Sequence, residues 1–307
     1  MNLFENILPP LTQVAFLVAI GAACRAKGVF THYGTSEISK FILNVTLPIM
    51  LFVSGAQSDV AELAYQGPIV FLAGVLCPLL GFGIGALVAW LFKLPPRQAT
   101  VVRIGAALSN TAFVGIPVCA ALWGAQGALL AAIYDQGINF PLLLLAPLAY
   151  RQSTSKNLWK ELLLAPMVWG LALGIGWNLL GIGLPIWIET PLTVIGNVTL
   201  PLSLVMIGAL AMPNTFAANF LRPLTAFLLS RLALVPIAVW ALALVFGWHS
   251  TGVSVIILQT AMPASVTATV MAQEYGAEAN LAASGAMFSV LLSLATLPLI
   301  AILVLGR

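Results

Sequence analysis

Two apolar stretches of this sequence, near residues 99–123 and near residues 251–273, are interrupted at their midpoints. The interrupting residues are Ser109, Asn110, Thr111, Gly115 and Pro117 in the first stretch, and Met262, Pro263, Ala264 and Ser265 in the second. Asn110 is a suitable N-cap for a helix that restarts there, and Pro263 suits the first turn of another. The N-terminal ends of two restarted helices attract an anion, above all a carboxylate. The simpler alternative is a pair of ordinary proline kinks.

A third candidate is Asp135, which lies in the apolar stretch near residues 127–150 together with Gln136 and Asn139. An ionisable side chain inside a membrane is costly and is a functional candidate by default. Asp135 could carry a proton, or could join Gln136 and Asn139 in supplying oxygen ligands to Na⁺. The alternative is an aspartate near the outer rim that reaches water. No other cofactor and no metal site is expected.

The composition requires these stretches to cross a membrane. Of the 307 residues, 61% are hydrophobic and 7% are charged, and the mean hydropathy is +1.06. A soluble domain carries about 25% charged residues. A spanning helix needs about 20 residues, so ten spans occupy about 200 positions and leave none for a soluble domain. The ten apolar segments lie near residues 8–26, 36–56, 67–92, 99–123, 127–150, 161–181, 188–211, 221–247, 251–273 and 279–305. The fold class predicted is an all-α polytopic membrane protein.

The basic residues alternate along these segments and predict the orientation. Ten of the twelve lie around the odd-numbered connections: Arg25, Lys27, Lys40, Lys93, Arg97, Arg103, Arg151, Lys156, Lys160 and Arg222. Lys- and Arg-rich short loops stay cytoplasmic, so both termini are expected on the non-cytoplasmic side of a plasma membrane or bacterial inner membrane. Arg231 lies inside a segment. It is expected to extend back to the cytoplasmic surface, although contact with an anionic substrate is the alternative.

The chain contains an internal repeat. Residues 44–56 read NVTLPIMLFVSGA and residues 197–209 read NVTLPLSLVMIGA, with eight of thirteen positions identical at an offset of 153. We therefore expect two five-helix units, 1–152 and 153–307. Because five is odd, the second unit must be inverted in the membrane, an arrangement typical of secondary transporters.

The repeated segment also predicts two kinks. Its asparagines and prolines are Asn44 and Pro48 in the first copy, and Asn197 and Pro201 in the second. Each proline should kink its helix, and the hydroxyl of Thr46 or Thr199 should bond a carbonyl that the proline frees.

Other function classes fit poorly. His32 and His249 would lie at opposite faces, away from any shared Ser or Cys nucleophile, so an enzyme is not expected. No Cys/His cluster has zinc spacing, no P-loop motif is present, and no basic cluster suggests nucleic acid. A channel would need a ring of carbonyls or charges, which the paired helix breaks do not suggest. A membrane sensor that binds the same ligand, or a channel-like facilitator, remains the alternative.

Several motifs resemble those of the auxin efflux carrier family. They are Asn110-Thr111 with Gly115-Ile116-Pro117, Ala261-Met262-Pro263 leading to Gln273-Glu274-Tyr275-Gly276, and the repeated Asn-x-x-Leu-Pro. The family includes the plant PIN carriers and bacterial carriers proposed for malonate or malate. The resemblance covers essentially the whole chain and implies helices 1, 2, 6 and 7 as a dimerising scaffold. It also implies helices 3–5 and 8–10 as a mobile unit that carries a helix 4/helix 9 crossover and moves as an elevator.

The resemblance assigns roles to individual residues. Gln136 is similar to a substrate-contacting glutamine of the plant carriers. Those carriers have a proline before the Asn-Thr pair, where this chain has Ser109, so auxin is not carried over as the substrate. The site expected is a crossover pocket with Gln136 close by, coupling through Asp135 and Asn139, and hinges at Ser109, Gly115, Pro117 and Pro263. Its substrate-binding residues are Asn110, Thr111, Met262, Pro263, Ala264 and Ser265. The sequence thus predicts a homodimeric secondary transporter of small organic anions in a lipid bilayer.

Overall fold

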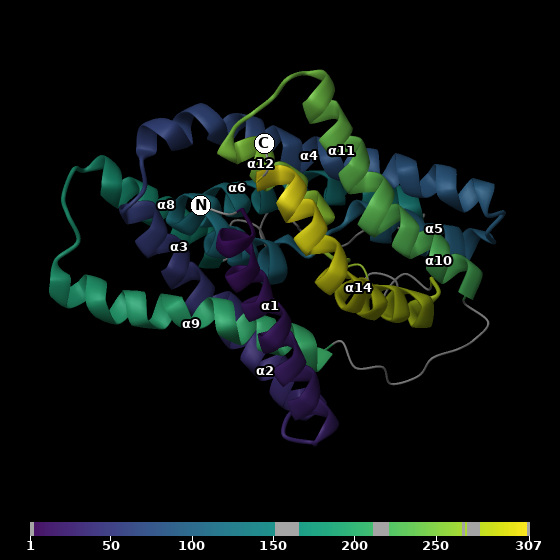
Figure 1. Ribbon diagram of the computed structural model, residues 1–307, viewed down its shortest axis with the longest axis horizontal. Coiled ribbons are helices and arrows are strands. Elements are labelled where there is room, and N and C mark those ends of the chain that lie inside the picture. The colour runs from purple at the N-terminus through teal and green to yellow at the C-terminus, as the bar shows by residue number, and fades with distance from the viewer. Residues whose placement is uncertain (1–2, 151–165, 211–220, 266–267, 269–276, 306–307) are drawn as a thin grey trace.

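The computed structural model describes residues 3–150, 166–210, 221–265, 268 and 277–305 (Figure 1). Throughout these ranges the regular structure is helical. The α-helices are α1 (Leu3–Ala26), α2 (His32–Phe41), α3 (Leu47–Ala56), α4 (Val60–Leu91), α5 (Pro96–Ala107), α6 (Ile116–Tyr150), α8 (Pro166–Leu179), α9 (Ile186–Leu210), α10 (Leu221–Leu229), α11 (Val235–Val245), α12 (Thr251–Ala261) and α14 (Ala279–Leu305). Three π-helical turns join some of them: η1 (Ile42–Thr46), η2 (Thr111–Gly115) and η4 (Ser230–Leu234).

Within the described ranges, six helical segments are long and apolar enough to cross a membrane. They are Tyr33–Ala56, Ala61–Leu91, Thr111–Ile138, Ile186–Met206, Leu221–Val245 and Asn280–Val304, and two shorter apolar helices cover Phe16–Ala26 and Thr251–Ala261. Large hydrophobic side chains lie exposed along them; on α4, Leu72 is 54% exposed and Trp90 is 71% exposed. Contiguous apolar surface on this scale is rare on soluble monomers. The chain is therefore an integral, polytopic membrane protein.

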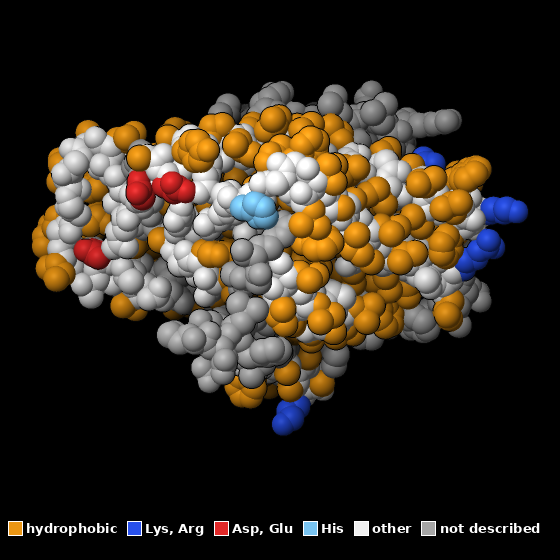
Figure 2. Space-filling view, turned by 45° about the horizontal axis from the view of Figure 1, so that its top comes forward, with side chains coloured by type: hydrophobic (Ala, Val, Ile, Leu, Met, Phe, Trp, Pro, Cys, Tyr) orange, Lys and Arg blue, Asp and Glu red, His pale blue; other side chains and the backbone are white. Residues whose placement is uncertain are grey.

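On the face of the molecule seen in Figure 2, charged side chains gather at the margins. Figure 2 shows acidic side chains at the left end of the visible face and basic ones at its right end and lower edge. A broad band of hydrophobic side chains separates the two groups. This distribution matches a slab of hydrocarbon bounded by two aqueous surfaces.

The helix at the centre of the fold is α6, which packs against α3, α4 and α12 (Figure 1). Its long span contains a break at Trp123 and Gly124, where the φ angle of Gly124 is +61°. A side chain would be strained at that angle, so glycine permits the chain to turn there. The segment thus consists of one helix that follows η2 and a second helix that begins near Ala125.

Glycines bring two helix pairs into close contact, α1 with α9 and α3 with α8. A methyl group added at Gly21 would collide with the carbonyl of Val205, and one added at Gly174 would collide with the carbonyl of Phe52. Small residues at helix contacts let membrane helices approach closely enough for backbone packing. The two contacts are related by one offset of 153 positions, which separates Gly21 from Gly174 and Phe52 from Val205.

The two repeat prolines are accommodated differently. Before Pro48 the chain forms η1, in which the N–H of Leu47 bonds the carbonyl of Ile42, five residues back. Pro201 lies inside the continuous helix α9. The expectation that Thr46 and Thr199 bond freed carbonyls is wrong, because their buried hydroxyls have no hydrogen-bond partner among the described residues. Near Pro48 the π-helical turn changes the bonding register instead.

The glycine contacts lead to a stability prediction with a matched control on the same helix. We expect Gly174→Ala to lower the thermal unfolding temperature of the detergent-purified protein, because the new methyl group meets the backbone of Phe52. Overpacking of this kind costs about 1–3 kcal/mol. Gly176 has open space around it, so Gly176→Ala should leave that temperature unchanged or raise it slightly. Equal effects of the two substitutions would contradict this packing arrangement.

Candidate functional site

The two interrupted stretches meet and cross. After α5 and α12 end, their chains run antiparallel for a few residues. The N–H of Asn110 donates to the carbonyl of Pro263 at 2.7 Å, and the N–H of Ser265 donates to the carbonyl of Leu108 at 3.0 Å. Backbone groups that the helix breaks would leave unpaired in the membrane therefore satisfy one another. We call the segments 108–110 and 263–265 the crossing.

Ser109 lies directly opposite Ala264 at the centre of the crossing, and both residues are buried. Met262 is the C-cap of α12 and is fully buried. The predicted Asn110 N-cap is present, since its side-chain oxygen accepts from the N–H of Phe113 at 3.3 Å at the start of η2. Most of the chain directly after Ser265 lies outside the described residues, as do Gln273, Glu274, Tyr275 and Gly276.

The Asp135 carboxylate reaches the beginning of η2. The hydroxyl of Thr111 donates to one oxygen of Asp135 at 2.5 Å. The amide of Gln136 lies 3.5 Å from the other oxygen. The sequence analysis named Thr111 and Asp135 in different segments, and the tertiary structure joins them, with Gln136, into one cluster beside the crossing. Asn139 belongs to α6, but its side chain lies outside the described set.

Sequence reasoning missed Gln259, a fully buried residue of α12. Its amide nitrogen donates to the carbonyl of Ala131 at 3.2 Å, which ties α12 to the second half of α6. A methyl group added at Gly115 would overlap the Gln259 amide, so glycine at that position makes room for it. Pro117 is buried near the start of α6. The available signal was a glutamine directly after the apolar run Val255, Ile256, Ile257 and Leu258.

The expectation that Arg231 extends to the membrane surface is wrong. Its side chain is 1% exposed and turns inward from η4. One guanidinium nitrogen, Nη1, donates to the carbonyl of Ala106 at 2.7 Å, and Nη2 donates to the carbonyl of Thr260. These carbonyls lie in the last turns of α5 and α12, where helix C-termini attract cations. They provide acceptors inside the protein, so the side chain does not extend to water.

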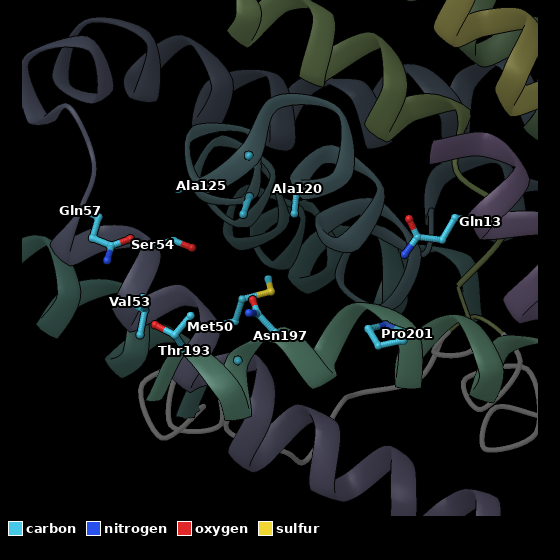
Figure 3. Close-up of a pocket in the computed structure, with 13 residues that line it drawn as sticks. Gln13, Met50, Val53, Ser54, Gln57, Ala120, Ala125, Thr193, Asn197 and Pro201 are labelled. Carbon is cyan, nitrogen blue, oxygen red and sulfur yellow. The ribbon is translucent and has the colours of Figure 1, made fainter. Parts of the chain in front are cut away.

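A cavity of about 440 Å³ lies next to α6 (Figure 3). Its lining residues are Gln13, Met50, Val53, Ser54, Gln57, Ala120, Gly124, Ala125, Ala128, Thr193, Gly196, Asn197 and Pro201. Figure 3 shows Ala120 and Ala125 on one wall, and Met50 and Asn197 on the opposite wall. None of these thirteen described residues is charged. The residues of the crossing are absent from this lining, whereas Asn197 and Pro201, expected only as kink residues, are part of it.

Within the described residues, no group of three or more His, Cys, Asp or Glu side chains could hold a metal ion. Cys77 and Cys119 are buried and free, and Cys24 is free and half-buried. The polar groups of the site are therefore backbone amides, hydroxyls, side-chain amides, one carboxylate and one guanidinium. They can bind an anion through hydrogen bonds or a small cation through their oxygen atoms.

Comparisons with known proteins agree with this chemistry. The profile of a family described as membrane transport protein matches residues 6–153 and 150–301. An "uncharacterized transporter" of Methanothermobacter thermautotrophicus is 26% identical over 304 residues, which are 97% of this chain and 98% of that protein. Another, of Methanocaldococcus jannaschii, is 21% identical over 93% of this chain and 95% of its own length.

A plant protein also matches part of the chain. A probable auxin efflux carrier component of Oryza sativa subsp. japonica is 26% identical over 140 residues, which are 44% of this chain and 33% of the plant protein. The resemblance found in the motifs is thus confirmed by matches over nearly the whole chain. This chain belongs to the membrane transport protein family that includes the auxin efflux carriers, and it is a transporter rather than an enzyme.

Proposed function

We propose that this chain is a secondary active transporter of small organic anions, carboxylates such as malonate, malate or auxin-like acids. The observation that carries the proposal is the crossing with the Thr111–Asp135 cluster beside it. The N-terminal end of η2 presents its amide groups there, and such an end favours negative charge. A substrate carboxylate bound there would contact Asn110 and Thr111, with Met262, Pro263, Ala264, Ser265 and Gln136 close by.

The position of Asp135 suggests how transport would be coupled to an ion. Its carboxylate accepts the Thr111 hydroxyl that a substrate carboxylate would also approach. Two carboxylates at one site repel each other strongly in a medium of low dielectric constant. A proton on Asp135 would remove that repulsion and free the hydroxyl, and a bound Na⁺ would neutralise it instead. Substrate and ion would then bind together.

The architecture we propose is ten membrane spans in an inverted 5+5 repeat, with both termini on the non-cytoplasmic side. The glycine contacts related by an offset of 153 support the repeat. The separation of acidic and basic side chains in Figure 2 supports the orientation. Helices α1, α3, α8 and α9 pack on one another, as a dimerising scaffold would. Helices α4, α5, α6, α10, α12 and α14 pack together as a second group, which we propose moves as an elevator.

The cavity supports our proposal that the substrate passes between these two groups of helices. Its walls come from α1, α3 and α9 on the scaffold side and from α6 on the other. The side chains of Gln13, Ser54, Gln57, Thr193 and Asn197 supply polar groups, and none of them carries charge that would repel an anion. Since α9 also contacts η2, we propose that the passage leads from this cavity toward the crossing.

Transport assays test the coupling proposal. Purified protein in liposomes should take up radiolabelled malonate, malate or indole-3-acetate saturably, and each acid is tested with and without a pH gradient or Na⁺. Asp135→Asn should abolish the response to the coupling gradient, because the amide cannot bind and release the proton or balance Na⁺. Asp59→Asn is the control, since Asp59 caps α4 and asparagine also caps well.

The results of these uptake assays distinguish the proposed coupled transporter from the alternative functions. Uptake that ignores both ions would limit Asp135 to a structural role. Uptake that never saturates would favour a channel-like facilitator, and ligand binding without uptake would favour a sensor. An Asp135→Asn protein that still responds to the gradient would contradict the coupling mechanism.

The cavity gives another prediction, with a control at the corresponding position of the repeat. Asn197→Ala should raise KM about tenfold with little change in the maximal rate, because it removes one hydrogen-bonding group on the substrate's path. Asn44 occupies the corresponding repeat position, but its amide donates to the carbonyl of Lys40 at 2.7 Å and it is absent from the cavity lining. Asn44→Ala should therefore leave KM unchanged. A similar KM shift in both variants would show that the cavity is not the path.

A further inference from the structure

One side chain connects the ends of the two interrupted helices. Arg231 donates to the carbonyl of Ala106 in the last turn of α5 and to that of Thr260 in the last turn of α12. These helices come from different halves of the chain, 125 and 29 residues away from Arg231. A single guanidinium group therefore bonds to two helix ends that lie far apart in the sequence.

The environment of Arg231 explains why a charge is retained in the membrane interior. In the part of the chain that the structure describes, no carboxylate forms an ion pair with it. An uncompensated buried charge is strongly destabilising. The two helix C-termini supply the compensation, because their carbonyl groups carry partial negative charge. Arginine suits this position better than lysine, since its planar fork offers separate N–H groups in fixed directions.

The backbone conformation around Arg231 helps to orient its side chain. Arg231 lies in the π-helical turn η4, which contacts α4, α5, α12 and α14. The hydroxyl of Ser230, the preceding residue, bonds the carbonyl of Ala226 at 2.6 Å, and both Ser230 and Leu232 are buried. A π-helical turn inserts an extra residue into a helix, and such turns are frequent at functional sites.

Arg231 acts close to the crossing. Ala106 and Thr260 each precede the crossing strands by only two or three residues. We propose that Arg231 is a positioning residue: it clamps the ends of α5 and α12 and so keeps the two backbone hydrogen bonds of the crossing in register. This role concerns the geometry of the crossing and is independent of which substrate is transported.

The geometry of the crossing can be tested directly through the rate at which an engineered disulfide forms across it. Ser109 and Ala264 face each other between the two crossing hydrogen bonds, as in a non-hydrogen-bonded antiparallel pair. The Cα atoms of such a pair lie about 4.5 Å apart, within the range that a disulfide spans. Ser109→Cys and Ala264→Cys are combined in a background without Cys24, Cys77 and Cys119. Disulfide formation with a membrane-permeant oxidant is then followed by mass spectrometry on monodisperse protein.

We expect Arg231→Met to slow formation of this disulfide about tenfold, because two charge-assisted hydrogen bonds near the crossing are lost. Arg231→Lys should restore part of the rate, since lysine keeps a cation at the helix ends. Arg222→Met is the control, because Arg222 is exposed in α10 on the same segment and should not change the rate. A parent-like rate for Arg231→Met would overturn the proposal.

A second comparison covers the case in which Arg231→Met does not fold. Arg231→Lys is then compared with Arg231→Gln, which keeps a donor but loses the charge, and the lysine protein should form the disulfide faster. Parent-like rates in both proteins would overturn the proposal. The assay needs no substrate, so its result stands apart from the transport experiments. A normal disulfide rate together with a large rise in KM for Arg231→Lys would instead indicate direct contact between Arg231 and the substrate.

Discussion

The backbone hydrogen bonds of the crossing are the constraint on which the rest of this structure depends. An interrupted helix leaves polar groups unpaired, and hydrocarbon offers no water to bind them. Here the two interruptions solve the problem jointly, since Asn110 and Pro263 pair across the gap, as do Ser265 and Leu108. Each break alone would leave these backbone groups without the partners that the other supplies. The two halves of the chain must therefore pack with their breaks face to face.

The two charged side chains beside the crossing lie at helix ends of opposite polarity. The Asp135 carboxylate lies by the start of η2, where the helix end is positive, and it accepts the hydroxyl of Thr111. The Arg231 guanidinium lies by the ends of α5 and α12, where helix ends are negative. Each of these two charged groups thus meets the end of a helix dipole that stabilises it. A carboxylate and a guanidinium group thus lie on the two sides of one short stretch of backbone.

Close packing around the crossing limits how the surrounding helices can move. Glycine at position 115 leaves room for the buried amide of Gln259. Elsewhere, the glycines of α1, α3, α8 and α9 allow the backbones of these helices to come into contact. Closely packed interiors shift between discrete arrangements rather than deform gradually. The cavity next to α6, by contrast, separates the two helix groups over part of their contact. The proposed movement of one group against the other would take place along this boundary.

Composition and hydropathy alone determined the membrane class, the positions of the apolar segments and the two polar interruptions, because these properties are local. The N-cap at Asn110 was also predictable, since capping depends on neighbours a few residues away. The motifs identified the family, and the profile match confirmed it. The span count, the orientation and the inverted repeat stay predictions that the contacts support.

Only the tertiary structure decided which side chains meet. Helix rotation and packing brought Thr111 to Asp135 and Gln259 to Gly115, and they made Asn197 part of a cavity wall. Hydropathy does not encode these rotations. Arg231 shows the physical reason most clearly, because its position in the sequence gives its approximate depth in the membrane but not its nearest acceptors. Those acceptors are backbone carbonyls of two distant helices, which exist at that place only once the chain has folded.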